Sequence, residues 1–201
     1  MQEIEAKFYV TGLDGIRMRL QSLEALLIQE RVLETNIRFD LPDGGLRAEG
    51  RVLRLRQDTD AHLAYKGAGT NEQGVLSRTE IEFVVEDYEK ARQLIQALGY
   101  RKLLYYEKYR STYGLDECHI MLDELPYGNF VEIEGRTIEA IQTAAEKLNL
   151  KWDTTIATGY HILFERLCAN NPNLDPTELS FATLKGMNIT ANDLSVHRAD
   201  D

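Results

Sequence analysis

Charged and apolar residues alternate along the first nine residues of the chain, and no other feature restricts the possible folds so strongly. Glu3, Glu5 and Lys7 are separated from one another by single apolar residues. A repeat of two residues is typical of a β-strand and not of a helix. One face of this strand is therefore charged and the other is apolar. On an ordinary half-buried strand, the charged face would point to solvent.

The same alternation returns along the chain and predicts eight strands. They cover residues 1–9, 25–40, 51–57, 61–67, 78–87, 100–113, 118–124 and 129–135. Most of them follow one another directly, which is typical of antiparallel hairpins.

Apolar residues at helical spacing predict four helices, at residues 12–24, 87–99, 137–150 and 155–169. The clearest of them is the helix at residues 87–99, where Asp87 is the predicted N-cap. Its predicted buried stripe consists of Ala91, Leu94, Ile95 and Leu98.

The helices decide which side of the sheet faces inward. An amphipathic helix buries its apolar stripe only against the apolar side of a sheet. If the helices lie outside a closed barrel, the charged side chains must line its interior. The predicted fold class is therefore α+β with mainly antiparallel β structure: an eight-stranded closed tunnel barrel with a charged interior and helices packed outside. The alternative is an open sheet whose charged side faces water and whose helices cover one face only.

A charged interior implies bound ions, because ions removed from water cost several kcal/mol each unless they are paired or bound. The basic residues on the charged faces are Lys7, Arg54, Arg56, Lys66, Arg78, Lys108 and Arg110. The acidic ones are Glu3, Glu5, Glu80, Glu82, Asp123, Glu132 and Glu134. Basic groups from several strands converge best on a compact polyanion. Pairs of carboxylates two residues apart suit a hard divalent cation, whereas the absence of paired Cys or His disfavours zinc.

The composition excludes several classes of partner. The 201 residues are 43% hydrophobic, which is enough for one core, and their net charge of −10 argues against long nucleic acids. No stretch reaches the ~18 to 20 apolar residues of a membrane span, and the charged first strand is unlike a secretory leader. Cys118 and Cys168 fit neither a zinc spacing nor a disulfide framework. We therefore expect a cytoplasmic protein with no nucleic acid and no membrane as partner.

Several segments resemble one family. EIEAK at residues 3–7 resembles the ExExK signature of the CYTH proteins, also called triphosphate tunnel metalloenzymes. Further segments match in the same order: LRLR at 53–56, YKG at 65–67, TEIEF at 79–83, EKYR at 107–110 and LDELPYGNFVEIEG at 122–135. The resemblance covers residues 1–168. The family includes class IV adenylate cyclases, thiamine triphosphatases and inorganic triphosphatases.

The resemblance implies an eight-stranded tunnel that uses Mg²⁺ or Mn²⁺ and acts on a triphosphate. By position, the residues implied to bind the substrate phosphates are Lys7, Arg54, Arg56, Lys66, Arg78, Lys108 and Arg110. Those implied to hold metal ions are Asp123, Glu132 and Glu134 at a principal site, and Glu3 and Glu5 at a second one. Glu3, Glu5 and Lys7 are also the predicted catalytic residues. Arg78, Glu80 and Glu82 lie where the family has further tunnel charges, which either bind substrate or keep neighbouring cations in place.

Three functions are compatible with these residues. The first is metal-dependent hydrolysis of inorganic, thiamine or nucleoside triphosphate, which a helix closing one end of the tunnel would favour. The second is an adenylate cyclase that converts ATP to cyclic AMP and pyrophosphate and needs an adenine pocket. The third is a non-catalytic module that binds polyphosphate, against which the intact acids at Glu3, Glu5 and Glu132 argue.

We predict one domain followed by a C-terminal extension. Residues 1–168 are expected to form the CYTH domain with its C-terminal helices, and residues 169–201 a loosely structured extension. The expected partner is a small-molecule triphosphate, and the expected state is a monomer or a homodimer.

Overall fold

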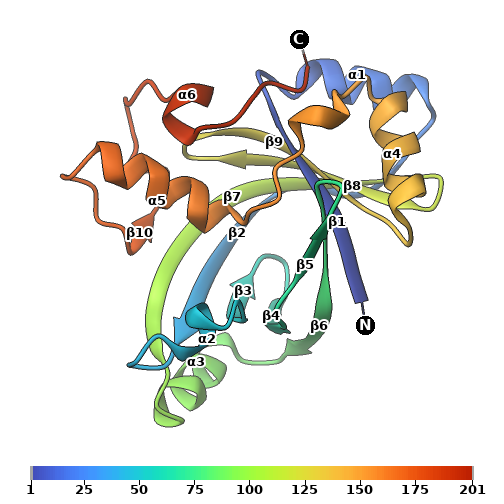
Figure 1. The fold of residues 1–201 in the computed structure, drawn as a ribbon. Coiled ribbons are helices and arrows are strands. Elements are labelled where there is room, and N and C mark those ends of the chain that lie inside the picture. The colour runs from blue at the N-terminus through green and yellow to red at the C-terminus, as the bar shows by residue number, and fades with distance from the viewer. Residues whose placement is uncertain (1, 201) are drawn as a thin grey trace.

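The chain forms a closed antiparallel barrel in the computed structural model, which describes residues 2–200 (Figure 1). The barrel strands are β1 (Gln2–Val10), β2 (Leu26–Asp40), β3 (Val52–Gln57), β4 (Ala61–Lys66), β6 (Val75–Val85), β7 (Arg101–Leu115), β8 (Cys118–Leu125) and β9 (Gly128–Glu134). They follow in the order β1-β9-β8-β7-β2-β3-β4-β6, and β6 returns to pair with β1. The predicted eight-stranded closed barrel is confirmed, and the open-sheet alternative is wrong.

Two short strands lie outside the ring: β5 (Thr70–Glu72) pairs antiparallel with β6, and β10 (Glu178–Leu179) pairs parallel with β7. The helices are α1 (Asp14–Ser22), α2 (Gly45–Ala48), α3 (Tyr88–Ala97), α4 (Ile138–Lys147), α5 (Tyr160–Asn170) and α6 (Ala191–Leu194), with a 3₁₀ turn η1 (Trp152–Thr154). Within residues 2–200, no helix has the length and apolar character that crossing a membrane requires.

The alternation along β1 divides its side chains between the two sides of the wall. Phe8 and Val10 point outward and are fully buried in an apolar cluster with residues of α1 and α4. Lys7 and the two glutamates before it point inward and are at most 7% exposed. The helices therefore cover the apolar outside of the barrel (Figure 1), and the charged sides line its interior, as the sequence predicts.

Helix α3 confirms its predicted start but not its predicted buried stripe. The Asp87 carboxylate accepts a hydrogen bond from the backbone N–H of Lys90. Of the stripe, only Ile95 is buried, whereas Leu94 and Leu98 are 61% and 66% exposed. The reason is geometric: α3 packs on the barrel mainly over β3 and β4, and a single row of its side chains reaches the wall.

The C-terminal segment differs most from its prediction. The helix begins at Tyr160 rather than at residue 155, because the chain before it runs along β1, where the N–H of Ile156 donates to the carbonyl of Lys7. The expected loose structure of residues 169–201 is wrong for the part that the structure describes. Leu179, Leu184 and Leu194 are at most 3% exposed and share one cluster with the inner face of α5.

Backbone bonds hold this segment at both ends. β10 pairs with β7, and the N–H of Ala199 donates to the carbonyl of Tyr9. The buried leucines of residues 170–200 are separated by polar residues at irregular spacing, so neither helical nor strand periodicity reveals them. The boundary after residue 168 stays a prediction.

Leu194→Ala should lower the free energy of unfolding by about 2–5 kcal/mol, because it removes a fully buried side chain and leaves a cavity. Leu98→Ala, at an exposed position, should change it by no more than about 0.5 kcal/mol. Urea denaturation followed by circular dichroism measures both. Equal effects of the two substitutions would mean that residues 170–200 are not part of the cooperative core.

Candidate functional site

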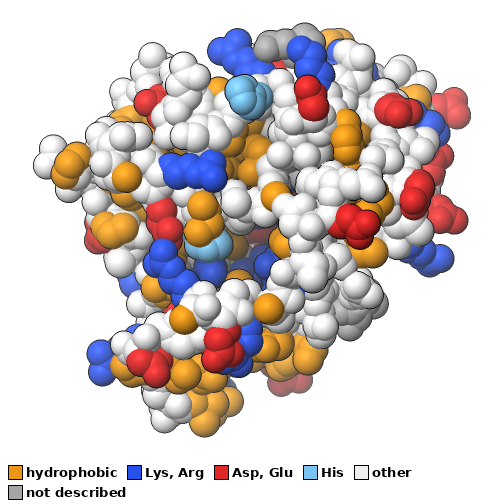
Figure 2. Space-filling model, in the orientation of Figure 1, with side chains coloured by type: hydrophobic (Ala, Val, Ile, Leu, Met, Phe, Trp, Pro, Cys, Tyr) orange, Lys and Arg blue, Asp and Glu red, His pale blue; other side chains and the backbone are white. Residues whose placement is uncertain are grey.

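A charged cavity of about 170 Å³ lies inside the barrel. Figure 2 shows a hollow on one face of the molecule, between α3 and α5, at whose base Lys, Arg and His side chains gather. The predicted site residues that line the cavity are Glu3, Glu5, Lys7, Arg54, Arg56, Lys66, Arg78, Lys108, Arg110, Glu132 and Glu134. Glu80 and Glu82 line it too. Every predicted site residue except Asp123 therefore lines this cavity.

Sequence reasoning missed part of the lining, namely Arg38, Tyr106, Tyr160 and His161. Arg38 lies on the same face of β2 as the buried Glu34, so the alternation rule was sufficient to find it. Tyr160 and His161 begin α5, whose sequence contains no sign that its first turn enters the barrel.

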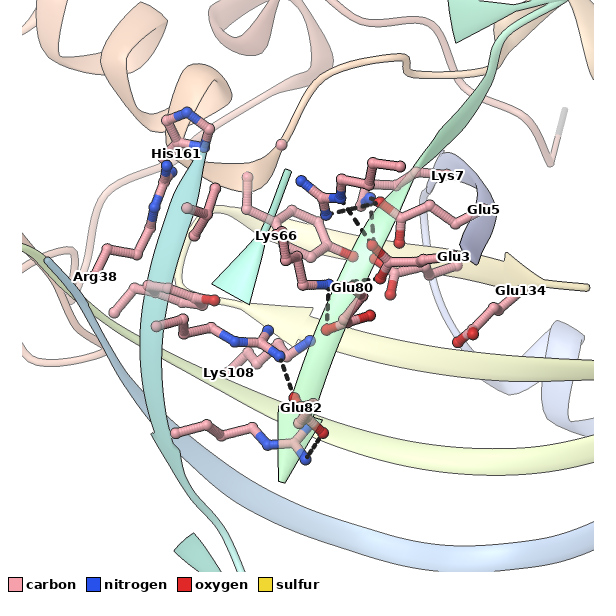
Figure 3. Close-up of a pocket in the computed structure, with 18 of the residues that line it drawn as sticks. Glu3, Glu5, Lys7, Arg38, Lys66, Glu80, Glu82, Lys108, Glu134 and His161 are labelled. Carbon is pink, nitrogen blue, oxygen red and sulfur yellow. Dashed lines mark hydrogen bonds and ion pairs between the residues drawn. The ribbon is translucent and has the colours of Figure 1, made fainter. Parts of the chain in front are cut away.

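Glu3 anchors the first group of ion pairs. Its carboxylate accepts from Lys66 Nζ at 2.5 Å and from Arg78 Nε at 2.7 Å, and Lys66 also lies 3.1 Å from Glu80 (Figure 3). Burial alone would raise the pKa of Glu3, but the two positive charges outweigh it and hold that pKa at about 2. Glu3 is therefore an anion that is fully compensated by cations of β4 and β6.

Glu132 anchors a second group. Lys7 Nζ lies 2.9 Å from one of its oxygens and Arg110 Nη2 lies 2.9 Å from the other. Burial would lower the pKa of Lys7, but the charges of Glu132 and Glu5 outweigh it and raise that pKa. The ammonium of Lys7 also lies 4.7 Å from the ring centre of Tyr160, so the first residue of α5 caps this group.

Two acids hold the cations in the middle of the cavity. Glu82 accepts from Arg54 at 3.0 Å and from Arg56 at 3.1 Å. Glu34 is 1% exposed and lies 3.4 Å from Lys108 Nζ. Burial would raise the pKa of Glu34, but Lys108 and the neighbouring arginines lower it to about 2. Sequence reasoning did not include Glu34, although a spacing of two and four residues places it on the same face of β2 as Asn36 and Arg38.

Asp123 does not reach the cavity, although it is a predicted metal ligand. It has no exposed surface, and both of its oxygens accept from Arg110 at 2.6 Å. One oxygen also accepts from Lys108 Nζ at 3.1 Å and from the Tyr160 hydroxyl at 2.7 Å. Among residues 2–200, no group of three or more acids, histidines or cysteines is placed to hold a metal ion. The predicted ligand sets are not preassembled, because cations of neighbouring strands engage most of these carboxylates.

Excess negative charge remains at one side of the cavity, where Glu5 and Glu134 are neighbours on β1 and β9 (Figure 3). Glu5 lies 3.6 Å from Lys7 Nζ and 3.7 Å from Arg78 Nη2. Glu134 forms no ion pair with any residue of the range 2–200. Burial, together with the charges of Glu3 and Glu132, raises its pKa to about 7. Burial and Glu132 likewise raise the pKa of Glu5, against the effect of Lys7. Crowded carboxylate oxygens of this kind fit a hard divalent cation, which relieves their repulsion.

Uncompensated positive charge remains at the other side, where Figure 3 shows Arg38 extending toward His161. Arg38 is 6% exposed, and its Nε has no hydrogen-bond partner. Burial and the nearby charge of Arg78 lower its pKa to about 10. Burial and the charges of Arg38, Arg47 and Arg78 lower the pKa of His161 to about 3, so this imidazole is neutral. The cavity is therefore polarised, with excess acid on one side and excess base on the other.

Comparison of this chain with known proteins identifies its family. The CYTH domain model matches residues 1–160. Adenylate cyclase CyaB of Aeromonas hydrophila is 30% identical over 188 residues, which cover 87% of this chain and 95% of the relative. The structure of the PH1012 protein of Pyrococcus horikoshii OT3 has a TM-score of 0.68 at 26% identity, and the match covers 79% of this chain and 96% of that one.

A further solved structure, HpAC1 of Hippeastrum, has a TM-score of 0.59 at 18% identity and covers 88% of this chain and 99% of its own. HpAC1 is a protein in which triphosphatase activity is dominant. At this identity, the likeness concerns the fold alone.

Glu134→Gln should increase the free energy of unfolding at about pH 8 but not at about pH 5, in the presence of EDTA. The native pKa of Glu134, about 7, lies above the ordinary value of 4.5, so the native state holds this proton more tightly than the unfolded chain. Between these values, the wild type loses stability as the pH rises, because Glu134 ionises beside other carboxylates. The neutral glutamine avoids that loss.

Urea denaturation at both pH values measures the difference. Glu146→Gln, at an exposed position on α4, is the control and should have the same effect at both pH values. Parallel pH profiles for wild type and Glu134→Gln would contradict the charge crowding described for this side of the cavity.

Proposed function

Because the chain belongs to the CYTH family, we propose that it hydrolyses a triphosphate inside the charged barrel with the help of Mg²⁺ or Mn²⁺. Members of the family are triphosphatases or adenylate cyclases that use divalent metals. The observation that carries the proposal is the polarised cavity, which offers an unpaired arginine on one side and an unpaired carboxylate on the other. A triphosphate with its metal ion supplies the opposite charge for both.

The basic residues of the cavity provide the contacts that phosphoryl transfer requires. The reaction depends on positioning and charge neutralisation more than on covalent chemistry. Lys7 of β1 and Lys108 and Arg110 of β7 converge around the Glu132 and Asp123 carboxylates. Each new charge-assisted hydrogen bond to phosphate contributes about 1.5–3 kcal/mol. Non-bridging phosphate oxygens would therefore compete with these carboxylates for the same donors.

Glu5 and Glu134 are the residues that would hold the divalent cation, with Glu3 and Glu132 as neighbours. When bound, such an ion lowers the pKa of a coordinated water and draws charge from the phosphate oxygens. The chain itself orients the substrate with Arg54 and Arg56, which Glu82 keeps in place at 3.0 and 3.1 Å. Tyr160 and His161, at the start of α5, limit the depth of the cavity.

The size and lining of the cavity favour hydrolysis of a compact substrate. Its volume of about 170 Å³ is below the roughly 300–1,000 Å³ of pockets that enclose whole drug-sized ligands. Apart from charged groups, the lining contains little besides Val52, Tyr106 and Tyr160. A chain of phosphates fits such walls, whereas an adenine ring needs an apolar slot.

Adenylate cyclase activity is the second candidate, because the 30% identical relative from Aeromonas hydrophila is an adenylate cyclase. In that reaction, the 3′-hydroxyl of ATP attacks its own α-phosphate and releases pyrophosphate. The same basic residues would bind the phosphates, and the nucleoside would have to lie beyond the enclosed part of the cavity.

A turnover assay separates the two. With Mg²⁺ and Mn²⁺ tested separately, inorganic triphosphate, thiamine triphosphate, ATP and GTP are each assayed for phosphate and for cyclic nucleotide. We expect phosphate release to be fastest from inorganic triphosphate, without cyclic AMP, and to stop when EDTA is added. Cyclic AMP and pyrophosphate from ATP would instead establish the cyclase.

Substitution of the acids distinguishes an enzyme from a module that only binds polyphosphate. Glu132→Gln removes the counterion of Lys7 and Arg110, so metal-free binding of inorganic triphosphate should become tighter. Metal-dependent turnover should fall by about 10- to 100-fold or more, because metal sites respond this strongly to changes in their shell. Glu3→Gln should behave in the same way. The binding module would remain as the function if the wild type showed no turnover with any substrate of the panel and the two variants still bound inorganic triphosphate more tightly than the wild type.

A further inference from the structure

Arg38 and His161 meet at the side of the cavity farthest from Glu134 (Figure 3). Arg38 lies on β2 and is only 6% exposed. Within residues 2–200, it nevertheless forms no ion pair. Its Nε is buried without a hydrogen-bond partner. The other cavity arginines, such as Arg54 and Arg78, each contact a carboxylate. A buried guanidinium of this kind requires an anionic partner.

The N-terminus of α5 faces the same place. The helix begins after Gly159, and no side chain caps its first N–H groups. Gly159 and the next two residues line the cavity. The N-terminus of a helix carries a partial positive charge and free N–H donors, which together attract anions. Gly159 also leaves room for the imidazole, because a Cβ at this position would lie 2.8 Å from His161 Nδ1.

Cations of four elements act on His161. Arg38 of β2, Arg47 of α2, Arg78 of β6 and Lys7 of β1 face it, and burial with these charges keeps the ring neutral. On its own helix, Glu165 is engaged by Arg47 at 2.9 Å, and Tyr160 donates its hydroxyl to Asp123. Among residues 2–200, no carboxylate forms an ion pair with His161, and its neutral imidazole keeps one N–H donor and one free nitrogen.

We infer that Arg38, His161 and the first turn of α5 form a subsite for the terminal, unesterified phosphate of the substrate. This inference rests on the proposed function, because it takes the substrate to be a triphosphate. It also sets the direction of the substrate: the free phosphate end lies against α5, and any head group extends toward the side where Glu134 lies. The family match ends at residue 160, so it does not include His161.

Binding at this subsite should be coupled to a proton. A phosphate dianion beside His161 offsets the surrounding cations and raises the pKa of the imidazole, which then takes a proton from solvent onto its free nitrogen. The protonated ring donates a second hydrogen bond and gains a charge opposite to that of the phosphate. A ring that only fills space against α5 would not take up this proton.

Isothermal titration calorimetry with inorganic triphosphate, in EDTA, tests the subsite. At about pH 6.5, near the ordinary pKa of histidine, titrations in two buffers of different ionisation enthalpy give the number of protons taken up. We expect His161→Phe to weaken binding by about 10- to 100-fold, the value of one charge-assisted hydrogen bond. His161→Gln should weaken it less but should take up about one proton fewer than the wild type. His197→Gln, at an exposed position, is the matched control and should resemble the wild type.

A second pair of probes tests the direction of the substrate. The wild type should bind ATP more tightly than ATP esterified with methyl on its γ-phosphate, and His161→Phe should lose most of this preference. Gly159→Ala displaces the imidazole without removing it and should reduce the same preference. Thermal melts confirm that each variant is folded.

Failure of the subsite and failure of the proposed function give different results. Wild-type binding and proton uptake that His161→Phe, His161→Gln and Gly159→Ala leave unchanged would overturn the subsite alone. Absence of triphosphate binding by the wild type, with or without Mg²⁺, would overturn the proposed function and the subsite with it.

Discussion

Compensation of buried charge by charge across neighbouring strands is the condition on which this structure depends. The apolar outside of the barrel is covered by helices, so the alternation of each strand places acids and bases in the interior. Removing such ions from water costs several kcal/mol each unless partners replace the water. Glu3 with Lys66 and Arg78, and Glu132 with Lys7, meet that requirement at 2.5–2.9 Å. The barrel therefore stays folded around a polar core only because its strands supply matched charges in register.

Within residues 2–200, the matching of charges stops at two residues that line the cavity. In this described part of the chain, Arg38 has no counterion on the side of α5, and Glu134 has none on the opposite side. Each mismatch lowers the stability of the protein alone and is relieved by a ligand of opposite charge. A fully paired interior would be more stable, but its cations would bind a phosphate only by leaving a carboxylate unpaired. Under the proposed function, this polarity would determine which end of the substrate lies on which side of the cavity.

The sequence predicts what strand periodicity controls and misses what tertiary packing controls. Alternation placed every predicted site residue except Asp123 on the cavity wall, because a closed barrel leaves each strand only one choice of inward face. Asp123 also points inward, but the side chains of Arg110 and Tyr160, which belong to other elements, cover it and separate it from the cavity. Leu94 and Leu98 of α3 have the spacing of a buried helical stripe, but both are exposed because they do not pack against the barrel. Sequence reasoning did not identify His161 as a cavity residue, because no local pattern indicates that the first turn of α5 enters the barrel.

The C-terminal segment connects packing outside the barrel with chemistry inside it. Leu179 and Leu194 are buried against α5 and hold its outer end. The inner end of α5 is held by Tyr160, whose hydroxyl donates to Asp123 and whose carbonyl accepts from Tyr127. Because Asp123 also orients Arg110 and Lys108, a shift of α5 would disturb these two cations together with His161. Leucines far from the cavity therefore support the positions of Arg110, Lys108 and His161 inside it.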